Sequence, residues 1–472
     1  MNNEDVAFMP AYKLAEKIQT QTITSQEVTE IIIERIKKIN SSVNAYCTPT
    51  FDIAREMASK SDERIKKEEK VGLLEGIPIS VKDLNWTKGI RTTFGSKIYE
   101  HFVPEKDDIV VKRLKDAGCV LLGKTNTPEF GFKGVTDNLI FGPSKNPWDL
   151  SKTPGGSSGG AGISVACGMA YLAQGSDGGG SIRIPSALCG VYGLKPTFGR
   201  TPNYPKELIF GESLGVNGPI VRYVKDAALM LQVMKGSFLG DRHSLPDDNE
   251  NYLEVIENIP NKLKIGYTLN LGYAKVIDSE VEKHILDSLD VFKNYGWEVD
   301  EIKMKLKKPE LPFYTLWTSK LAFELAPKLD EWENKMDPDI VRLVKGGMGY
   351  DAFSLIRAQK ARKEIYETFY KIFTEIDILI TPTTAVTAFD TGIMFPPIIN
   401  NKKVSPTAWQ AFTFPFNLTE QPAASIPCGW SEDGLPIGMQ IIGPKFDESK
   451  ILQVSKVFED AKPWQEKRPQ LP

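Results

Sequence analysis

The sequence reads Pro154-Gly-Gly-Ser-Ser-Gly-Gly-Ala-Gly162, then an apolar run, then Gln174-Gly-Ser-Asp-Gly-Gly-Gly-Ser-Ile-Arg-Ile-Pro185. Ser157 and Ser181 each stand in a glycine-rich loop. Glycine leaves backbone N–H groups uncovered and allows backbone angles that other residues rarely adopt. A hydroxyl beside uncovered N–H groups is a starting point for acyl transfer, so the residue that would activate the hydroxyl decides the chemistry.

Composition is that of an ordinary soluble globular protein. Of 472 residues, 41% are hydrophobic and 25% are charged, and the formal net charge is −3. This balance gives no reason to expect nucleic acid or a membrane as a partner. No run of about 18 apolar residues occurs, and the first residues lack the pattern of a signal peptide. The five cysteines are scattered and only three histidines occur, so we expect a cytoplasmic protein with free thiols and no metal.

Helix and strand patterns alternate along the first half of the chain. Thr24 and Glu27 form a capping-box pattern that opens a helix over residues 24–39. The following segments are, in order, a strand at 76–83, a helix at 107–118, a strand at 119–122, a helix at 159–168 and a strand at 170–174. This alternation predicts an α/β fold with a mostly parallel sheet.

The second half mixes helical and hairpin signals. Residues 264–267 and 297–302 have strand patterns, and the helix between them stops at Gly296. Residues 310–375 have a helical pattern and could cap a pocket. Ala423–Cys428 and Leu435–Ile442 flank a Trp-Ser-Glu-Asp-Gly turn, which predicts a hairpin.

Gly118-Cys-Val-Leu-Leu-Gly-Lys-Thr125 matches the phosphate-loop pattern letter for letter. That loop needs flexible residues between its glycines and a helix after its lysine. Here Cys119 to Leu122 has a strand pattern, and Pro128 follows closely, which disfavours a helix before it. The sequence therefore argues against nucleotide binding.

Gly155-Gly-Ser-Ser-Gly159 matches the nucleophile elbow of α/β-hydrolases, which would make the protein a His-dependent esterase. That fold needs a later Asp or Glu and then a histidine. The only later histidines are His243, in a polar stretch, and His284, off the apolar face of its helix. A histidine triad stays as the weaker alternative.

Lysine is the next candidate for a base. The ordinary pKa of a lysine is ~10.4, so this pKa must fall by about three units for lysine to act as a base near pH 7. Burial can cause a shift of this size. Lys82 lies in an apolar strand-like run, whereas most other lysines lie in charged stretches. A structural alternative is that Lys82 merely pairs with Asp83 at the end of a strand.

Several segments together resemble the amidase signature family. They are Gly76-Ile-Pro-Ile-Ser-Val-Lys-Asp83, Gly155-Gly-Ser-Ser-Gly-Gly160, Gly175-Ser-Asp-Gly-Gly-Gly-Ser-Ile-Arg-Ile-Pro185, Thr92-Thr-Phe-Gly-Ser96, Gly123-Lys-Thr-Asn-Thr-Pro-Glu129, Cys189-Gly-Val-Tyr-Gly-Leu-Lys-Pro196, Pro415-Phe-Asn-Leu-Thr419 and Gly434-Leu-Pro-Ile-Gly438. The resemblance implies one α/β domain over residues 1–472, with a central twisted, mixed, mostly parallel sheet covered by helices on both faces. A helical cap or pocket-lining region would fall at about residues 305–375.

The resemblance also assigns roles. Ser181 would be the nucleophile, Ser157 a bridging serine after a cis peptide bond, and Lys82 the neutral base. The remaining assignments are an oxyanion hole built from the backbone N–H groups of Gly178, Gly179, Gly180 and Ser181, and loop support from Asp177, Arg183 and Ser158. No cofactor is implied, and Ser158 could exchange roles with Ser157.

The substrate class follows less directly from the resemblance. The implied activity is hydrolysis of a small-molecule amide, and the loop looks most like that of acylamide hydrolases and hydrolases of nylon-type cyclic oligomers. A glutamine-hydrolysing A subunit of a tRNA-dependent amidotransferase is the alternative, although that branch usually has Thr at Gly178 and Gln at Ile184. The aromatic segment Leu311–Trp317, with Phe395 and Trp409, could line an acyl pocket. A homo-oligomer stays open.

Overall fold

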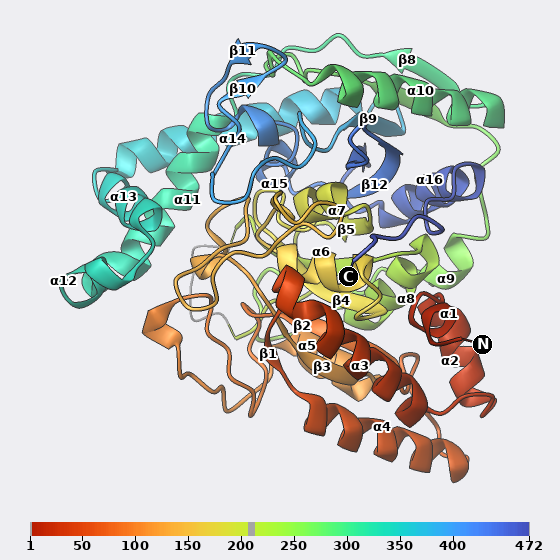
Figure 1. Ribbon diagram of the computed structural model, residues 1–472. Coiled ribbons are helices and arrows are strands. Elements are labelled where there is room, and N and C mark those ends of the chain that lie inside the picture. Colours follow the sequence, from red (N-terminus) through yellow and green to blue (C-terminus); the bar gives the residue numbers. More distant parts are fainter. Residues whose placement is uncertain (1, 206–212, 472) are drawn as a thin grey trace.

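The computed structural model describes residues 2–205 and 213–471. Within these residues, one sheet has the strand order β1-β3-β2-β4-β6-β5-β12-β13-β9-β7-β8 (Figure 1). The strands are β1 (Tyr46–Pro49), β2 (Pro78–Lys82), β3 (Val120–Thr125), β4 (Leu172–Asp177), β5 (Tyr192–Lys195), β6 (Val216–Val221), β7 (Lys264–Tyr267), β8 (Glu298–Glu301), β9 (Ile378–Pro382), β12 (Ala423–Trp430) and β13 (Pro436–Ile442). A separate ribbon joins β10 (Ile398–Ile399) to β11 (Lys402–Lys403).

The sheet is mixed, as expected for one large α/β domain. Strand β2 pairs in parallel with β3 and β4, and β7 pairs in parallel with β8 and β9. The strands between these two blocks pair antiparallel, including the expected hairpin of β12 and β13. Parallel pairs thus lie in two blocks that antiparallel pairs connect, so that parallel pairing covers a smaller share of the sheet than the alternation of elements predicts.

Helices cover both faces of the sheet (Figure 1). The helices are α1 (Asn3–Ala7), α2 (Ala11–Gln19), α3 (Ser25–Val43), α4 (Phe51–Lys66), α5 (Ile109–Asp116), α6 (Gly159–Ala166), α7 (Arg183–Cys189), α8 (Val224–Met234), α9 (Tyr252–Val255), α10 (Ser279–Tyr295), α11 (Glu310–Leu325), α12 (Leu329–Trp332), α13 (Pro338–Gly347), α14 (Ala352–Ile372), α15 (Pro415–Leu418) and α16 (Glu448–Ala461).

Strand β13 shows why both faces need cover, since successive side chains point to opposite sides. Gly438 lies against Ala187 of α7, so that a larger residue there would collide with the helix. Met439, the next residue, belongs to the apolar core that also holds Phe292 of α10 and Phe458 of α16. All seven residues of the strand are buried, as a strand between two helical layers requires.

Local sequence signals set several element boundaries. Thr24 caps α3, and both halves of its capping box with Glu27 are present. Helix α10 ends at Gly296, whose φ of 95° is easily adopted only by glycine. Strand β3 runs through the phosphate-loop match, so the exclusion of a phosphate loop is confirmed. The helical pattern at 310–375 is confirmed by α11 to α14, which extend from the body of the molecule (Figure 1).

Candidate active site

Lys82 is the last residue of β2, and its side chain is fully buried. Its Nζ lies 2.7 Å from Ser157 Oγ and 3.0 Å from Ser176 Oγ. The side chain of Asp83 points elsewhere, accepting a hydrogen bond from the backbone N–H of Thr93 at 3.1 Å. The alternative in which Lys82 only pairs with Asp83 is therefore not what the structure contains.

Burial changes the acid–base character of Lys82. It lowers the pKa of the ammonium group to about 7, against the opposing attraction of Asp177. A large share of the side chain is then neutral near pH 7 and can accept a proton. Such a group 2.7 Å from a serine hydroxyl has the geometry of a general base.

Among the described residues, two further lysines are fully buried, which sequence analysis missed. Burial lowers the pKa of Lys124 to about 8 and that of Lys195 to about 7. Lys124 Nζ donates to Thr87 Oγ1 and Thr92 Oγ1, each at 3.0 Å, and Lys195 Nζ donates to the carbonyl of Pro196 at 3.0 Å. A lowered pKa therefore does not single out Lys82, but its contact with Ser157 does.

The two adjacent serines have different surroundings. Ser157 follows a cis peptide bond from Gly156, as the family resemblance implies, and contacts Lys82. Ser158 Oγ instead donates to the carbonyl of Ser176 at 3.2 Å, and its backbone N–H donates to the carbonyl of Ser181 at 3.1 Å. The contacts of Ser158 thus link the two glycine-rich loops, and Ser157 is the hydroxyl next to the lysine.

The loop before α7 presents backbone N–H groups beside Ser181. Among the described residues, no acceptor lies on the N–H groups of Gly178, Gly179 or Ser181. The N–H of Gly180 differs, because it donates to Asp177 Oδ1 at 2.8 Å. Because this N–H group already donates to Asp177, the expected oxyanion hole is reduced to the N–H groups of Gly178, Gly179 and Ser181.

Each glycine of this loop faces a neighbour that leaves no room for a side chain. A Cβ on Gly178 would lie 2.7 Å from the ring of Trp317, and one on Gly179 would lie 2.7 Å from the ring of Phe313. A Cβ on Gly180 would collide with Thr413. The glycines therefore let α11 pack directly on the loop, a reason that the sequence does not reveal.

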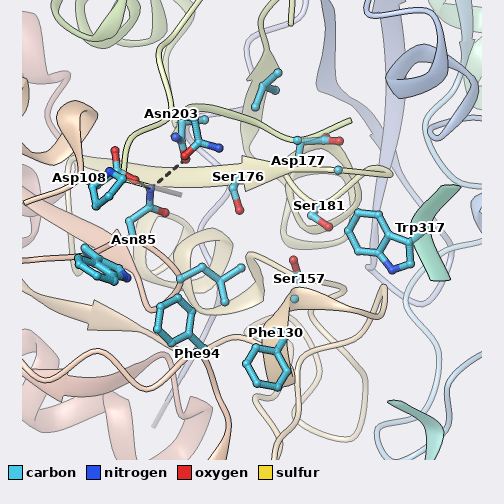
Figure 2. A pocket seen from close by; sticks show the side chains of 18 residues that line it. Asn85, Phe94, Asp108, Phe130, Ser157, Ser176, Asp177, Ser181, Asn203 and Trp317 are labelled. Carbon is cyan, nitrogen blue, oxygen red and sulfur yellow. Dashed lines mark hydrogen bonds between the residues drawn. The ribbon is translucent and has the colours of Figure 1, made fainter. Parts of the chain in front are cut away.

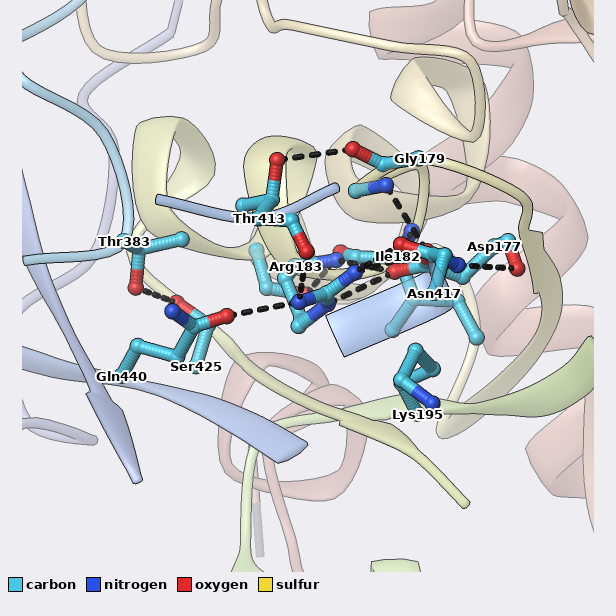
Figure 3. A network of polar contacts seen from close by, with 12 residues as sticks. Asp177, Gly179, Ile182, Arg183, Lys195, Thr383, Thr413, Asn417, Ser425 and Gln440 are labelled. Carbon is cyan, nitrogen blue, oxygen red and sulfur yellow. Dashed lines mark hydrogen bonds and ion pairs between the residues drawn. The ribbon is translucent and has the colours of Figure 1, made fainter. Parts of the chain in front are cut away.

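A buried ion pair holds the loop in place (Figure 3). Arg183 Nε lies 2.9 Å from Asp177 Oδ2, and both side chains are fully buried. Arg183 also donates to the carbonyl of Thr413 at 2.8 Å, to Gln440 Oε1 at 2.7 Å and to Asn417 Oδ1 at 2.7 Å. Burial alone would raise the pKa of Asp177, but the guanidinium holds this pKa below its usual value. The contacts of Asp177 and Arg183 are therefore those expected of residues that hold the loop in its conformation.

Sequence analysis did not name Asn417 or Gln440 as site residues. Asn417 donates to the carbonyl of Asp177 at 3.1 Å, and Gln440 accepts from Arg183. Gln440 is fully buried in β13 between apolar neighbours. A polar residue inside an apolar strand is a signal that could have identified it.

Ser181 stands where two cavities meet. The first, which we call the polar cavity after the polar side chains at its two ends, has a volume of about 130 Å³. Ser157 and Ser181 lie at one end and Asn85, Asp108 and Asn203 toward the other (Figure 2). Its wall also contains aromatic side chains, those of Trp86, Phe94, Phe130 and Trp317. The second, the aromatic cavity, has a volume of about 400 Å³. Its wall includes Phe313, Tyr314, Trp317, Phe395 and Trp409, from the aromatic set that the sequence suggested for a pocket.

The histidines lie outside this region. His243 packs edge-on against Phe198, with ring centroids 5.3 Å apart. His284 lies on α10 against Gly429. Neither lines the polar or the aromatic cavity in the part of the chain that the structure describes.

Residues 2–205 and 213–471 contain no cluster of three or more His, Cys, Asp or Glu side chains that could hold a metal ion. None of their helices is both long enough and apolar enough to cross a membrane.

Comparison with known proteins identifies the family. A family model described as Amidase matches residues 27–452. The chain belongs to the amidase family. An A subunit of glutamyl-tRNA(Gln) amidotransferase from Carboxydothermus hydrogenoformans is 37% identical, covering 99% of this chain and 100% of its own. An acylamidase from Rhodococcus erythropolis is 34% identical, covering 99% of this chain and 98% of its own.

Solved structures of this family have the same fold. A bacterial aryl acylamidase superposes with a TM-score of 0.91 at 29% identity, covering 97% of each chain. A 6-aminohexanoate cyclic dimer hydrolase superposes with a TM-score of 0.90 at 28% identity, covering 98% of this chain and 99% of its own. The resemblance to acylamide and nylon-type oligomer hydrolases is thereby confirmed at the level of family and fold.

Proposed function

We propose that this amidase hydrolyses carboxylic amides through an acyl-enzyme on Ser181, with Ser157 and Lys82 as its proton relay. The observation that carries the proposal is the 2.7 Å contact between Lys82 Nζ and Ser157 Oγ at the wall of the cavity that Ser181 shares. A buried lysine with a pKa of about 7 supplies the base that Ser181 needs.

The proposed reaction has two halves. Ser181 Oγ attacks the carbonyl carbon, its proton passes to Ser157, and the Ser157 proton passes to Lys82. The N–H groups of Gly178, Gly179 and Ser181 stabilise the oxyanion, each contributing about 3 kcal/mol in the transition state. The C–N bond then breaks as the proton returns through Ser157 to the leaving nitrogen. Water repeats the sequence and releases the acid.

The helices α11 to α14 would cap this site, as the sequence suggested. Helix α11 provides Phe313 and Trp317, which lie against the loop, and α13 provides Arg342 and Leu343 to the aromatic cavity. Such a cap would exclude water from the site, and the exclusion of water would strengthen the hydrogen bonds to the oxyanion.

Glutamine hydrolysis is the second candidate, because a curated relative at 37% identity is an amidotransferase A subunit. Two features of this chain weigh against it. The acyl part of free glutamine carries an ammonium group, yet none of the described residues lining the aromatic cavity, on the side of Ser181 away from Ser157, is a carboxylate. The carboxylates of Asp108 and Asp177 line the polar cavity instead. In addition, the ring of Trp317 fills the space of any side chain at position 178, where the amidotransferase branch usually has Thr.

A fluorophosphonate probe tests the nucleophile. We expect stoichiometric labelling of Ser181, which the Ser181→Ala variant abolishes together with amide hydrolysis. The double variant His243→Ala/His284→Ala is the control and should keep full activity, because neither histidine lines a cavity of the site. Activity that disappears in this control but persists in Lys82→Ala would contradict the lysine relay. Strong turnover of glutamine would favour the second candidate.

A further inference from the structure

The position of Ser157 distinguishes the two cavities that meet at Ser181. Ser157 lines the polar cavity, and it is absent from the wall of the aromatic cavity. Ser181, by contrast, lines both. Figure 2 shows Ser157 and Ser181 at one end of the polar cavity, with Asn85, Asp108 and Asn203 toward the other end.

In amide hydrolysis the leaving nitrogen must receive a proton before the C–N bond can break. In the proposed mechanism this proton comes from Ser157 Oγ, so the nitrogen must lie within hydrogen-bond reach of that atom. The nitrogen and the carbon chain of the acyl group are the two other substituents of the carbonyl carbon, so they point in different directions from it. A nitrogen beside Ser157 therefore directs the amine into the polar cavity and the acyl chain into the aromatic cavity.

We infer that this amidase selects amides with a bulky apolar or aromatic acyl group and a small, polar amine or ammonia. This inference rests on the proposed function of Ser181 and adds the substrate class to it. The acyl group should be the larger of the two, because the aromatic cavity has a volume of about 400 Å³ and the polar cavity one of about 130 Å³. A cavity of about 150 Å³ just holds a benzene ring, so the polar cavity leaves little room for an aromatic amine with substituents.

The far wall of the polar cavity adds a chemical preference. Asn85 Nδ2 donates to Asp108 Oδ2 at 2.8 Å and to Asn217 Oδ1 at 3.0 Å. These three side chains are nearly fully buried. An apolar amine forms no hydrogen bond with this polar end of the cavity, whereas a small polar amine can form one.

The wall of the aromatic cavity contains more aromatic side chains than that of the polar cavity and, among the described residues, neither an asparagine nor a carboxylate, although Lys133 and Arg342 also line it. Phe313 and Trp317 from α11 stack with ring centroids 5.8 Å apart, and Phe414 closes on Phe313 at 5.1 Å. Stacked and tilted rings of this kind favour flat or extended apolar groups. Tyr314 and Gln410 are polar members of the wall, and the Gln410 amide is 3.4 Å from the Tyr314 hydroxyl.

Phenylacetamide and acetanilide test this assignment, because they are isomers that exchange the aromatic ring between acyl group and amine. Aniline is the better leaving group, so intrinsic reactivity does not favour phenylacetamide. We expect kcat/KM for phenylacetamide to exceed that for acetanilide by about ten-fold or more, measured as release of the acid. Equal rates or a preference for acetanilide would overturn the inference.

Two cavity variants connect the preference to its cause. Phe395 lines only the aromatic cavity, and Phe395→Ala should lower kcat/KM for phenylacetamide several-fold with little change for acetanilide. Leu84 lines only the polar cavity, and Leu84→Ala should raise kcat/KM for acetanilide. Phe353→Ala is the matched control, since Phe353 is exposed on α14. The opposite pattern in the two variants would reverse the assignment.

Fluorophosphonate labelling separates failure of this inference from failure of the proposed function. A protein whose Ser181 takes the label but which leaves phenylacetamide intact has a working nucleophile and a different substrate class, so the inference alone would fail. A protein whose Ser181 is not labelled and which cleaves neither isomer would contradict the proposed function and the inference with it.

Discussion

Three fully buried lysines show, at the scale of the residue, that a contact and not burial alone decides the chemistry. Lys82, Lys124 and Lys195 all have a pKa lowered by burial. Lys124 binds threonine hydroxyls and Lys195 binds a backbone carbonyl, whereas Lys82 lies 2.7 Å from Ser157 Oγ. Burial supplies neutral lysines at several places in this fold, and one contact distance separates the candidate base from the others.

The pH dependence of kcat/KM is the first prediction. Lys82 acts as a base only when it is neutral, so kcat/KM should rise with pH through about 7 and level off above it. Lys82→Ala should lower kcat by about 10²–10⁴-fold. Lys195 also has a pKa of about 7, so Lys195→Met is the control and should keep the rise. A rise that disappears only in Lys195→Met would mean that the wrong lysine has been assigned.

Gly178 allows a second prediction at this scale. Gly178→Ala places a Cβ 2.7 Å from Trp317 and must displace the loop or the ring, so kcat should fall by about a hundred-fold. In a Trp317→Leu background the same change should cost far less. Gly346→Ala is the control, since it has open space around it. Equal costs in both backgrounds would show that the ring is not the obstacle.

At the scale of the element, helix ends follow local sequence. Helix α3 begins where Thr24 and Glu27 form a capping box, and α10 ends where Gly296 takes a positive φ. Both helix boundaries depend on contacts between residues only a few positions apart. Such boundaries are therefore readable before any tertiary contact is known.

Loss of the α3 cap is the third prediction. Thr24→Ala removes the hydrogen bond to the N–H of Glu27 and should lower the free energy of unfolding by about 1 kcal/mol. Ser41→Ala, an exposed position in the last turn of the same helix, should change it by less than about 0.5 kcal/mol. Denaturant unfolding measures both. A Thr24→Ala variant as stable as the parent would mean that packing alone sets this boundary.

At the scale of the whole molecule, the Arg183 network joins distant segments of chain. The guanidinium contacts Asp177 at the end of β4, Gln440 in β13 and Asn417 in α15 (Figure 3). The loop beside Ser181 is thereby fixed to α15 and β13, which lie more than two hundred residues later in the chain. The shape of the candidate oxyanion hole depends on this closure.

Breaking that network is the fourth prediction. Arg183→Met leaves Asp177 buried without its partner and should lower the free energy of unfolding by about 3–5 kcal/mol. Lys345→Met breaks the exposed pair with Glu333 and should cost less than about 1 kcal/mol. Thermal or denaturant unfolding compares the two. A similar small cost for both would show that the buried pair is replaceable.

The sequence by itself determined the fold class, the main elements, the family and the segments that carry Lys82, Ser157 and Ser181, because these depend on local pattern and on motifs of fixed spacing. Only the tertiary structure decided which lysine meets a serine, that Gly180 donates to Asp177, and that α11 lies on the glycine loop. It also decided that the predicted hairpin of β12 and β13 pairs antiparallel with β5 and β9 in the middle of the sheet. The lysine–serine contact and the packing of α11 join segments far apart in the chain, and such contacts leave no periodic or local trace in the sequence. The Gly180–Asp177 bond spans only three residues, but it belongs to a loop whose shape Asn417 and Arg183 hold through contacts with distant segments.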